Sequence, residues 1–170
     1  MSRLIWAAPW FRGQTPVIIK MRHLAYRQLR EENHPDCVVC SPNNAKGLGL
    51  SFCLGPDEVV EASFECEKVL QGYPATLHGG VVTALLDGAM TNCLFAHGHV
   101  SVTAQLEVRF RHPVATQGTA RVRAWMVSSD RPLHELAAEL IQDGRVKATA
   151  RARFFDKTAT RLCGRASIDS

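Results

Sequence analysis

The chain has 170 residues, of which 46% are hydrophobic, and its formal net charge is +4. This length suits one domain with a real core, and the composition argues against a disordered chain. The mild basic excess comes without basic tracts interleaved with aromatic residues, so nucleic acid is not the expected partner, whereas an anionic ligand is compatible with it. The longest apolar run, near residues 81–86, is far shorter than the ~20 residues of a membrane span, so we expect a soluble protein without a membrane partner.

Residues 1–34 are predicted to form a basic helical extension. Residues 16–32 have the pattern of an amphipathic helix with Pro16 in its first turn. Pro9 interrupts the apolar segment before this helix and no convincing cleavage site follows, which disfavours a secretory signal. The first 30 residues contain five arginines and no acidic residue, so a mitochondrial-type presequence stays open, as does a true start at Met21.

The six cysteines, in a chain with no clear secretory signal, predict free thiols in a reducing compartment, and we expect a cytoplasmic protein. His34, Cys37 and Cys40 form an H-x-x-C-x-x-C pattern that could supply three zinc ligands. No fourth ligand is evident nearby. The sequence therefore favours a buried turn here, with no bound metal and no cofactor.

Alternation of apolar and polar residues predicts several long strands. Between Val100 and Phe110 the apolar residues occupy the even positions and the polar residues, Thr103 among them, the odd ones, until Pro113 ends the strand. The same pattern recurs in four other segments: 48–54, 60–66, 119–128 and 146–154. Residues 133–141 have a helical composition, but they also alternate and lie between long strands, which favours a further strand.

The segment from Gly79 to about Ala96 is apolar on nearly every face, so a helix there must be enclosed by other structure. The simplest enclosure is one antiparallel sheet of five or six strands wrapped around a single central helix, an α+β fold. We assign residues 35–157 to this domain and residues 158–170 to a C-terminal tail.

Asp87 is the only charged residue of this helix. An ionised carboxylate among hydrocarbons costs several kcal/mol unless it is paired or hydrogen-bonded. Asp87 must therefore have a partner, a ligand or a raised pKa. A purely structural hydrogen bond to a neighbouring loop is the alternative interpretation.

His78, Gly79 and Gly80 open the same helix, where free N–H groups and the positive end of the helix dipole can polarise a carbonyl oxygen. Glycines let a ligand approach that backbone closely. At a rise of ~1.5 Å per residue, Gly79 and Asp87 stand ~12 Å apart, too far to act on one carbonyl within one chain. Two such helices lying antiparallel in a dimer would bring Gly79 of one chain to Asp87 of the other.

The stretch GYPATLHGGVVTALLDGAM, with the strand and the Arg-His-Pro at 111–113 after it, resembles the hotdog-fold acyl-CoA thioesterases of the phenylacetate-pathway (PaaI-like) type. The resemblance covers roughly residues 35–156, and its most specific element is the nine-residue step from His78 to Asp87. The upstream CVVCSPNNAKGLGL resembles the C-x-x-C, G-L opening of one branch of that family. Many members of this branch have an acidic residue directly after the aspartate, where this chain has Gly88.

This resemblance implies hydrolysis of an acyl- or aryl-CoA thioester by a homodimer or homotetramer with sites shared between subunits. Asp87 would act as nucleophile or general base, and the Gly79 amide of the partner subunit would hold the oxyanion. Thr103 aligns with a hydroxyl residue that assists the catalytic acid or its water in related enzymes. Some relatives also have an Asn or Gln just before the glycine loop, and Gln71 lies near that position. His78 is expected to orient the loop rather than to act as the base.

Substrate contacts are expected from Gly80 and from basic residues near the CoA phosphates. Arg109 and Arg111 are the main candidates, with Arg151 and Arg153 beside them, although a solvated charged face explains these arginines equally well.

Two other functions stay open from the sequence. A hotdog dimer could hold an acyl-CoA or a fatty acyl chain without turning it over, although a pure apolar binder has no reason to bury a carboxylate. A hydratase or dehydratase on the same fold would need a histidine and a carboxylate facing one another, and His78 leaves that open. Release of free thiol distinguishes the thioesterase from both.

Overall fold

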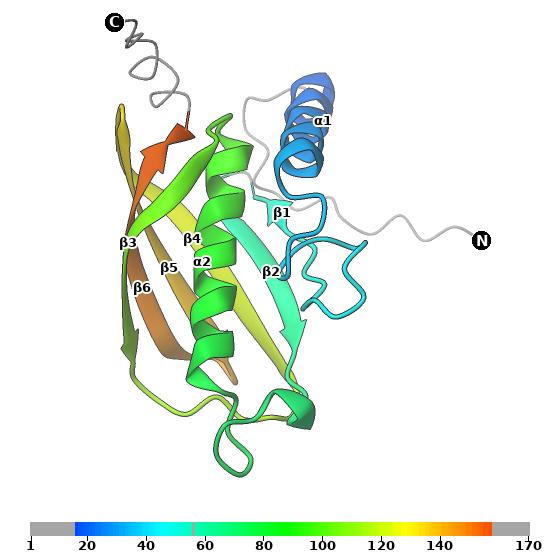
Figure 1. Cartoon of the computed structure of the whole chain (residues 1–170), viewed down its shortest axis with the longest axis vertical. Coiled ribbons are helices and arrows are strands. Elements are labelled where there is room, and N and C mark those ends of the chain that lie inside the picture. Colours follow the sequence, from blue (N-terminus) through cyan, green and yellow to red (C-terminus); the bar gives the residue numbers. More distant parts are fainter. Residues whose placement is uncertain (1–15, 56, 158–170) are drawn as a thin grey trace, which may run out of the picture.

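The computed structural model describes residues 16–55 and 57–157, with side chains from Met21 onward. One six-stranded antiparallel sheet curves around the long helix α2, and a second helix, α1, lies outside it (Figure 1). The helices are α1 (Pro16–Asn33), the short 3₁₀ helix η1 (Lys68–Leu70) and α2 (Gly79–Ala96). The strands are β1 (Cys53–Leu54), β2 (Val60–Glu65), β3 (Ser101–Phe110), β4 (Thr119–Asp130), β5 (Leu133–Gln142) and β6 (Arg145–Asp156). Residues 1–15 of the possible presequence and the predicted C-terminal tail at 158–170 lie outside the described residues, whereas the helix predicted at 16–32 is α1.

The strand order in the sheet is β1-β2-β4-β5-β6-β3, so β3 forms one edge. Alternating burial along β2 and β6 confirms the predicted strands, and residues 133–141 do form a strand, β5. The flanking strands decide the conformation of β5, because β4 and β6 hydrogen-bond to it along both sides. The expected architecture of a sheet around one central helix is confirmed.

Helix α2 supplies the centre of the core. Leu85, Leu86, Ala89 and Met90 are fully buried against the sheet, and burial continues to Phe95 near the end of the helix. By length and hydropathy alone this helix could cross a membrane, but most of it is enclosed within the fold. Enclosure on nearly all sides is the physical reason for its uniformly apolar composition.

The predicted strand at 48–54 is shorter than expected. Leu50 and Phe52 are buried as their alternation suggests, but only Cys53 and Leu54 pair with β2. The Leu50 N–H instead donates to the carbonyl of Val39, at 2.9 Å. This part of the chain therefore pairs with the turn after α1 rather than with the sheet.

The prediction that the apolar residues of β3 share a single face is wrong, because the strand contains a bulge at Ala104. Thr103 pairs with Phe154 and Gln105 pairs with Arg153, which leaves Ala104 as an extra residue. An extra residue reverses which side chains face the helix. Odd positions therefore face α2 before the bulge, even positions face it afterwards, and Val102 is left 48% exposed.

Helix α1 is held against α2 by a buried polar contact. The Tyr26 hydroxyl donates to Oδ1 of Asn92 at 2.7 Å, and Nδ2 of Asn92 donates to the carbonyl of Gly88 at 2.8 Å. Burial raises the pKa of Tyr26 to about 12, so the phenol stays protonated as the donor. Every polar atom in this contact is satisfied, as a buried network requires.

The turn after α1 rests directly on α2 at Gly88. A Cβ at this position would lie 2.5 Å from Cγ1 of Val39, whose side chain is itself buried. Glycine at 88 is thus explained by packing: Val39 occupies the space that a side chain would need.

Gly88→Ala is expected to lower the free energy of unfolding by ~1–3 kcal/mol, because the new methyl group overpacks this contact. Chemical denaturation of the wild type and the variant would measure the change. Val39→Ala should recover part of the loss in the double variant. A stability gain from alanine alone, as helix propensity predicts for an uncrowded site, would contradict the assigned contact.

Candidate functional site

Asp87 lies half-buried in the middle of α2 and has a specific hydrogen-bond partner. The Thr103 hydroxyl donates to its Oδ1 at 2.8 Å. The bulge at Ala104 makes this possible, since it lets Thr103 and the later even-numbered residues of β3 both face α2. Burial raises the pKa of Asp87, while the Thr103 hydrogen bond and the nearby His34 oppose that rise. The carboxyl group is therefore more basic than a solvated one and has a hydroxyl beside it.

His34, directly after α1, is a neighbour of Asp87 that the sequence did not connect with it. Its ring packs edge-on against Phe95, with 4.9 Å between ring centroids. Burial lowers the pKa of His34, and the charge of Asp87 opposes this effect. The two residues are distant in sequence and only the packing of α1 on α2 brings them together, so no local motif could have linked them.

The N-terminus of α2 is capped by His78. Its Nδ1 accepts a hydrogen bond from the Gly80 N–H at 2.9 Å, which fixes the ring against the first turn. The Gly80 amide, expected to contact substrate, is therefore already engaged. The Gly79 N–H has no acceptor within the part of the chain that the structure describes, and Gly79 is exposed.

Gln71 lies beside this helix start. It forms an isolated β-bridge with Leu77, and the His78 N–H donates to the Leu70 carbonyl at 2.9 Å. The loop from η1 to α2 therefore brings an exposed Gln71 next to His78. Its part in substrate binding stays a prediction.

Gly79 and Asp87 do not meet within one chain, because eight residues of helix separate them by ~12 Å. Strand β3 runs alongside both positions. Its start reaches Asp87 through Thr103, and its end reaches Gly79, where a Cβ would lie 3.5 Å from Cζ of Phe110. One edge strand thus connects the two halves of the expected site.

The expected CoA-binding arginines lie on the other face of the sheet. Arg109, Arg111 and Arg151 line a groove of about 480 Å³ on the side away from α2, together with Glu107 and Glu139. Arg109 lies 3.7 Å from Glu107, and both side chains are well exposed. The structure does not bring these arginines to Asp87 of the same chain, so their role in binding remains a prediction.

A second buried group of ionisable residues was not expected from the sequence. His134 and Asp156 are almost fully buried, with 3.6 Å between Nε2 and Oδ2, and the His99 ring lies 4.3 Å from the His134 ring. The Arg131 guanidinium approaches the same carboxylate oxygen at 3.4 Å. These residues come from separate strands and a loop, so local sequence carried no signal for them.

The sequence model of the thioesterase superfamily matches residues 75–149, which contain α2 and most of the sheet. A phenylacetic acid degradation-related protein from Ralstonia eutropha is similar in structure, with 26% identity, a TM-score of 0.63, and coverage of 77% of this chain and 98% of that one. The fold is the hotdog fold of the PaaI-like thioesterases.

Two further structures share this hotdog fold. The PaaI protein from the E. coli phenylacetic acid degradation operon aligns with a TM-score of 0.67 and 16% identity, over 81% of this chain and 95% of that one. A thioesterase protein from Streptococcus pneumoniae, solved with coenzyme A, aligns with a TM-score of 0.60 and 17% identity, over 64% and 88% of the two chains. At these identities the two structures support the fold alone.

Asp87→Asn is expected to stabilise the hotdog domain at neutral pH. Because burial raises the pKa of Asp87 in the folded state, the folded protein binds the proton more tightly than the unfolded one. The wild type therefore loses stability as pH rises from the ordinary carboxyl range through this raised pKa. Thermal unfolding of both proteins against pH should show the asparagine advantage at neutral pH and its disappearance in acid; an advantage independent of pH would contradict the assigned cause.

Proposed function

We propose that this hotdog protein hydrolyses an acyl- or aryl-CoA thioester to the free acid and CoA. The observation that carries the proposal is the half-buried Asp87 carboxyl group, hydrogen-bonded to Thr103 and made more basic by burial. A binding module without turnover would have no use for a carboxylate at this cost. The match to the thioesterase superfamily supports the same chemistry.

In the proposed reaction, a water molecule attacks the thioester carbonyl while Asp87 removes a proton from that water. In the alternative route, an oxygen of Asp87 attacks the carbonyl directly. The Thr103 hydroxyl, already bonded to Oδ1, holds one carboxylate oxygen and leaves the other for the reaction. The free Gly79 N–H of the partner subunit stabilises the oxyanion of the tetrahedral intermediate. Collapse of that intermediate breaks the C–S bond, and the CoA thiolate takes up a proton. If an Asp87 oxygen has attacked directly, the product at this stage is an acyl–Asp87 anhydride, which water then hydrolyses to the free acid and the Asp87 carboxylate.

A shared site requires a dimer, and the edge strand β3 indicates how one forms. Ten residues of β3 pair only with β6, which leaves the other edge unpaired in the described chain. Val102 and Phe110 on this strand are 48% and 56% exposed. A long, unpaired edge with exposed apolar side chains is a ready template for pairing with a second copy.

Antiparallel pairing of two β3 strands about a two-fold axis supplies the missing half of each site. It places the end of one strand, next to Gly79, beside the start of the other, next to Asp87. The free amide of one subunit then faces the carboxyl group of its partner. A homodimer, or a homotetramer built from such dimers, is therefore the proposed working form.

Recognition of CoA is proposed to use Arg109 and Arg111, with Gly80 and Gln71 beside the helix start. In a single chain the sheet separates the two arginines from Asp87. They can reach CoA phosphates only if the nucleotide extends to the outer face or if another subunit presents them. A cytoplasmic location remains part of the proposal.

Thiol release from short, medium, long and aromatic acyl-CoA substrates tests the reaction. The wild type should release free CoA from at least one class, and Asp87→Ala should remain folded and release none, because the base or nucleophile is gone. Unchanged release by Asp87→Ala would exclude the mechanism. No release by dimeric wild type would favour the binding module, and a change at an enoyl group would identify a hydratase.

Gly79 offers a matched pair of variants for the oxyanion donor. Gly79 is the first residue of α2, where proline is tolerated, and His78 before it already has φ −61° and ψ 134°, which suit a residue that precedes proline. Gly79→Pro removes only the N–H and is expected to lower kcat by about 10²–10³-fold. Gly79→Ala retains the N–H and meets only ordinary contact with Phe110, so it should stay active. Equal losses in both variants would contradict the donor role.

Mixing two inactive variants tests whether the site is shared between subunits. In a heterodimer of Asp87→Asn and Gly79→Pro, one of the two shared sites holds both Asp87 and the Gly79 amide. Random reassociation of equal amounts should restore roughly a quarter of wild-type activity. Variants mixed without subunit exchange are the control and should stay inactive. No recovery after confirmed exchange would mean that the two residues do not serve one intersubunit site.

A further inference from the structure

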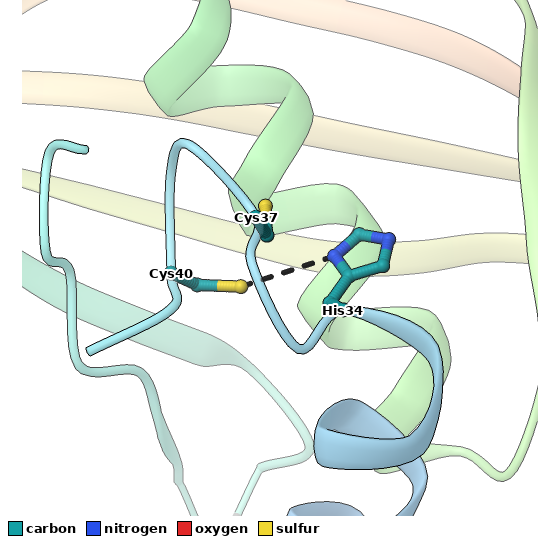
Figure 2. Close-up of side chains that lie close together, drawn as sticks. All are labelled: His34, Cys37 and Cys40. Atoms are coloured by element: carbon teal, nitrogen blue, oxygen red, sulfur yellow. Dashed lines mark hydrogen bonds between the residues drawn. The ribbon is translucent and has the colours of Figure 1, made fainter. Parts of the chain in front are cut away.

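The turn that follows α1 brings three metal-binding side chains together. Nδ1 of His34 and the Sγ atoms of Cys37 and Cys40 all lie within 4.8 Å of one another, and Nδ1 of His34 is 3.9 Å from Sγ of Cys40 (Figure 2). The ligand atoms of one tetrahedral zinc ion lie roughly 3.3–3.8 Å apart, given bonds of ~2.1 Å to nitrogen and ~2.3 Å to sulfur. Small rotations of these side chains would complete that geometry.

We propose that His34, Cys37 and Cys40 bind one divalent cation of the zinc class, on the face of α2 next to the proposed active site. The ligand set is two thiolates and one imidazole, which suits a borderline-soft metal and not magnesium or calcium. The described residues offer three ligands, so a water molecule completes the tetrahedron. This proposal reverses the expectation drawn from sequence, where the lack of a nearby fourth ligand favoured a simple buried turn.

The backbone of the turn is already arranged to support thiolates. The Val39 N–H donates to Sγ of Cys37 at 3.4 Å, and the Ser41 N–H closes the turn on the Cys37 carbonyl at 3.1 Å. The buried Asn92 side chain also forms a hydrogen bond with Cys40. Hydrogen bonds to ligating atoms of this kind orient them and tune the metal.

The surroundings favour a metal over a redox-active disulfide. Cys40 is buried, whereas the reactive thiols of C-x-x-C redox motifs are partly exposed. A cation can still be bound at a buried cysteine, because the charge of the metal deprotonates a coordinating thiol. A disulfide would use only the two cysteines, whereas a metal ion would also use the His34 ring that lies against them.

The cation would fix the geometry around Asp87. His34 directly follows the end of α1, whereas Val39, between the two cysteines, contacts Gly88 on α2. One ion therefore joins α1 to the turn and presses the turn onto the helix beside the proposed catalytic carboxyl group. The metal site does not depend on the proposed reaction, and its test uses no activity measurement.

Metal analysis of the full chain, purified under reducing conditions without chelators, tests the site. The wild type should carry about one equivalent of zinc. Cys37→Ser, Cys40→Ser and His34→Gln should each lower the zinc content by about tenfold or more. Cys53→Ser, which alters an exposed cysteine outside the cluster, is the matched control and should keep the metal.

Cobalt provides a second measurement that does not require the variants to fold. Cobalt added to wild-type protein stripped by a chelator should give the charge-transfer absorption of a cobalt–thiolate bond, at one equivalent per chain, and should raise the unfolding temperature. Folded wild type with neither zinc nor this absorption would overturn the proposal. A Cys37–Cys40 disulfide found by peptide mapping of the purified protein would also overturn it, in favour of a redox turn. Zinc retained by Cys40→Ser would place the metal elsewhere.

Discussion

The central constraint on this protein is that an almost wholly apolar helix must be enclosed while it carries one carboxylate. A single curved antiparallel sheet covers most of α2, and the packing of α1 and its following turn covers part of the rest. Asp87 stays only half-buried, near the edge where β3 leaves the enclosure incomplete. The incomplete side of the core is thus the side on which the proposed chemistry and the proposed dimer contact both fall.

A single extra residue in β3 sets the local geometry of that edge. Without the bulge at Ala104, Thr103 and Phe110 would face opposite sides of the sheet, because they are seven residues apart and side chains alternate along a strand. With the bulge, both face α2, one at Asp87 and the other at Gly79. The same strand can therefore serve the carboxyl group at its start and the helix N-terminus at its end.

The segment that follows α1 extends this arrangement beyond the sheet. Val39 occupies the space over Gly88, Tyr26 reaches the same part of α2 through Asn92, and His34 lies close enough to Asp87 to influence its pKa. In this chain a glycine follows the aspartate because a neighbouring turn fills that position. A cation held by this turn would stiffen the support of the helix that carries Asp87 from outside the core.

The sequence by itself determined the elements whose signals are local. Periodicity predicted α1 and most strands, and uniformly apolar composition predicted the enclosed helix α2. The spacing from His78 to Asp87 indicated the proposed site, and the cost of a buried charge identified Asp87 as unusual. Tertiary structure alone decided the bulge at Ala104, the pairing of residues 48–50 with the turn instead of the sheet, and the placement of His34 beside Asp87. Each of these depends on contacts between segments distant in the chain, and a local pattern of hydrophobicity carries no information about which distant segment will fill a given space.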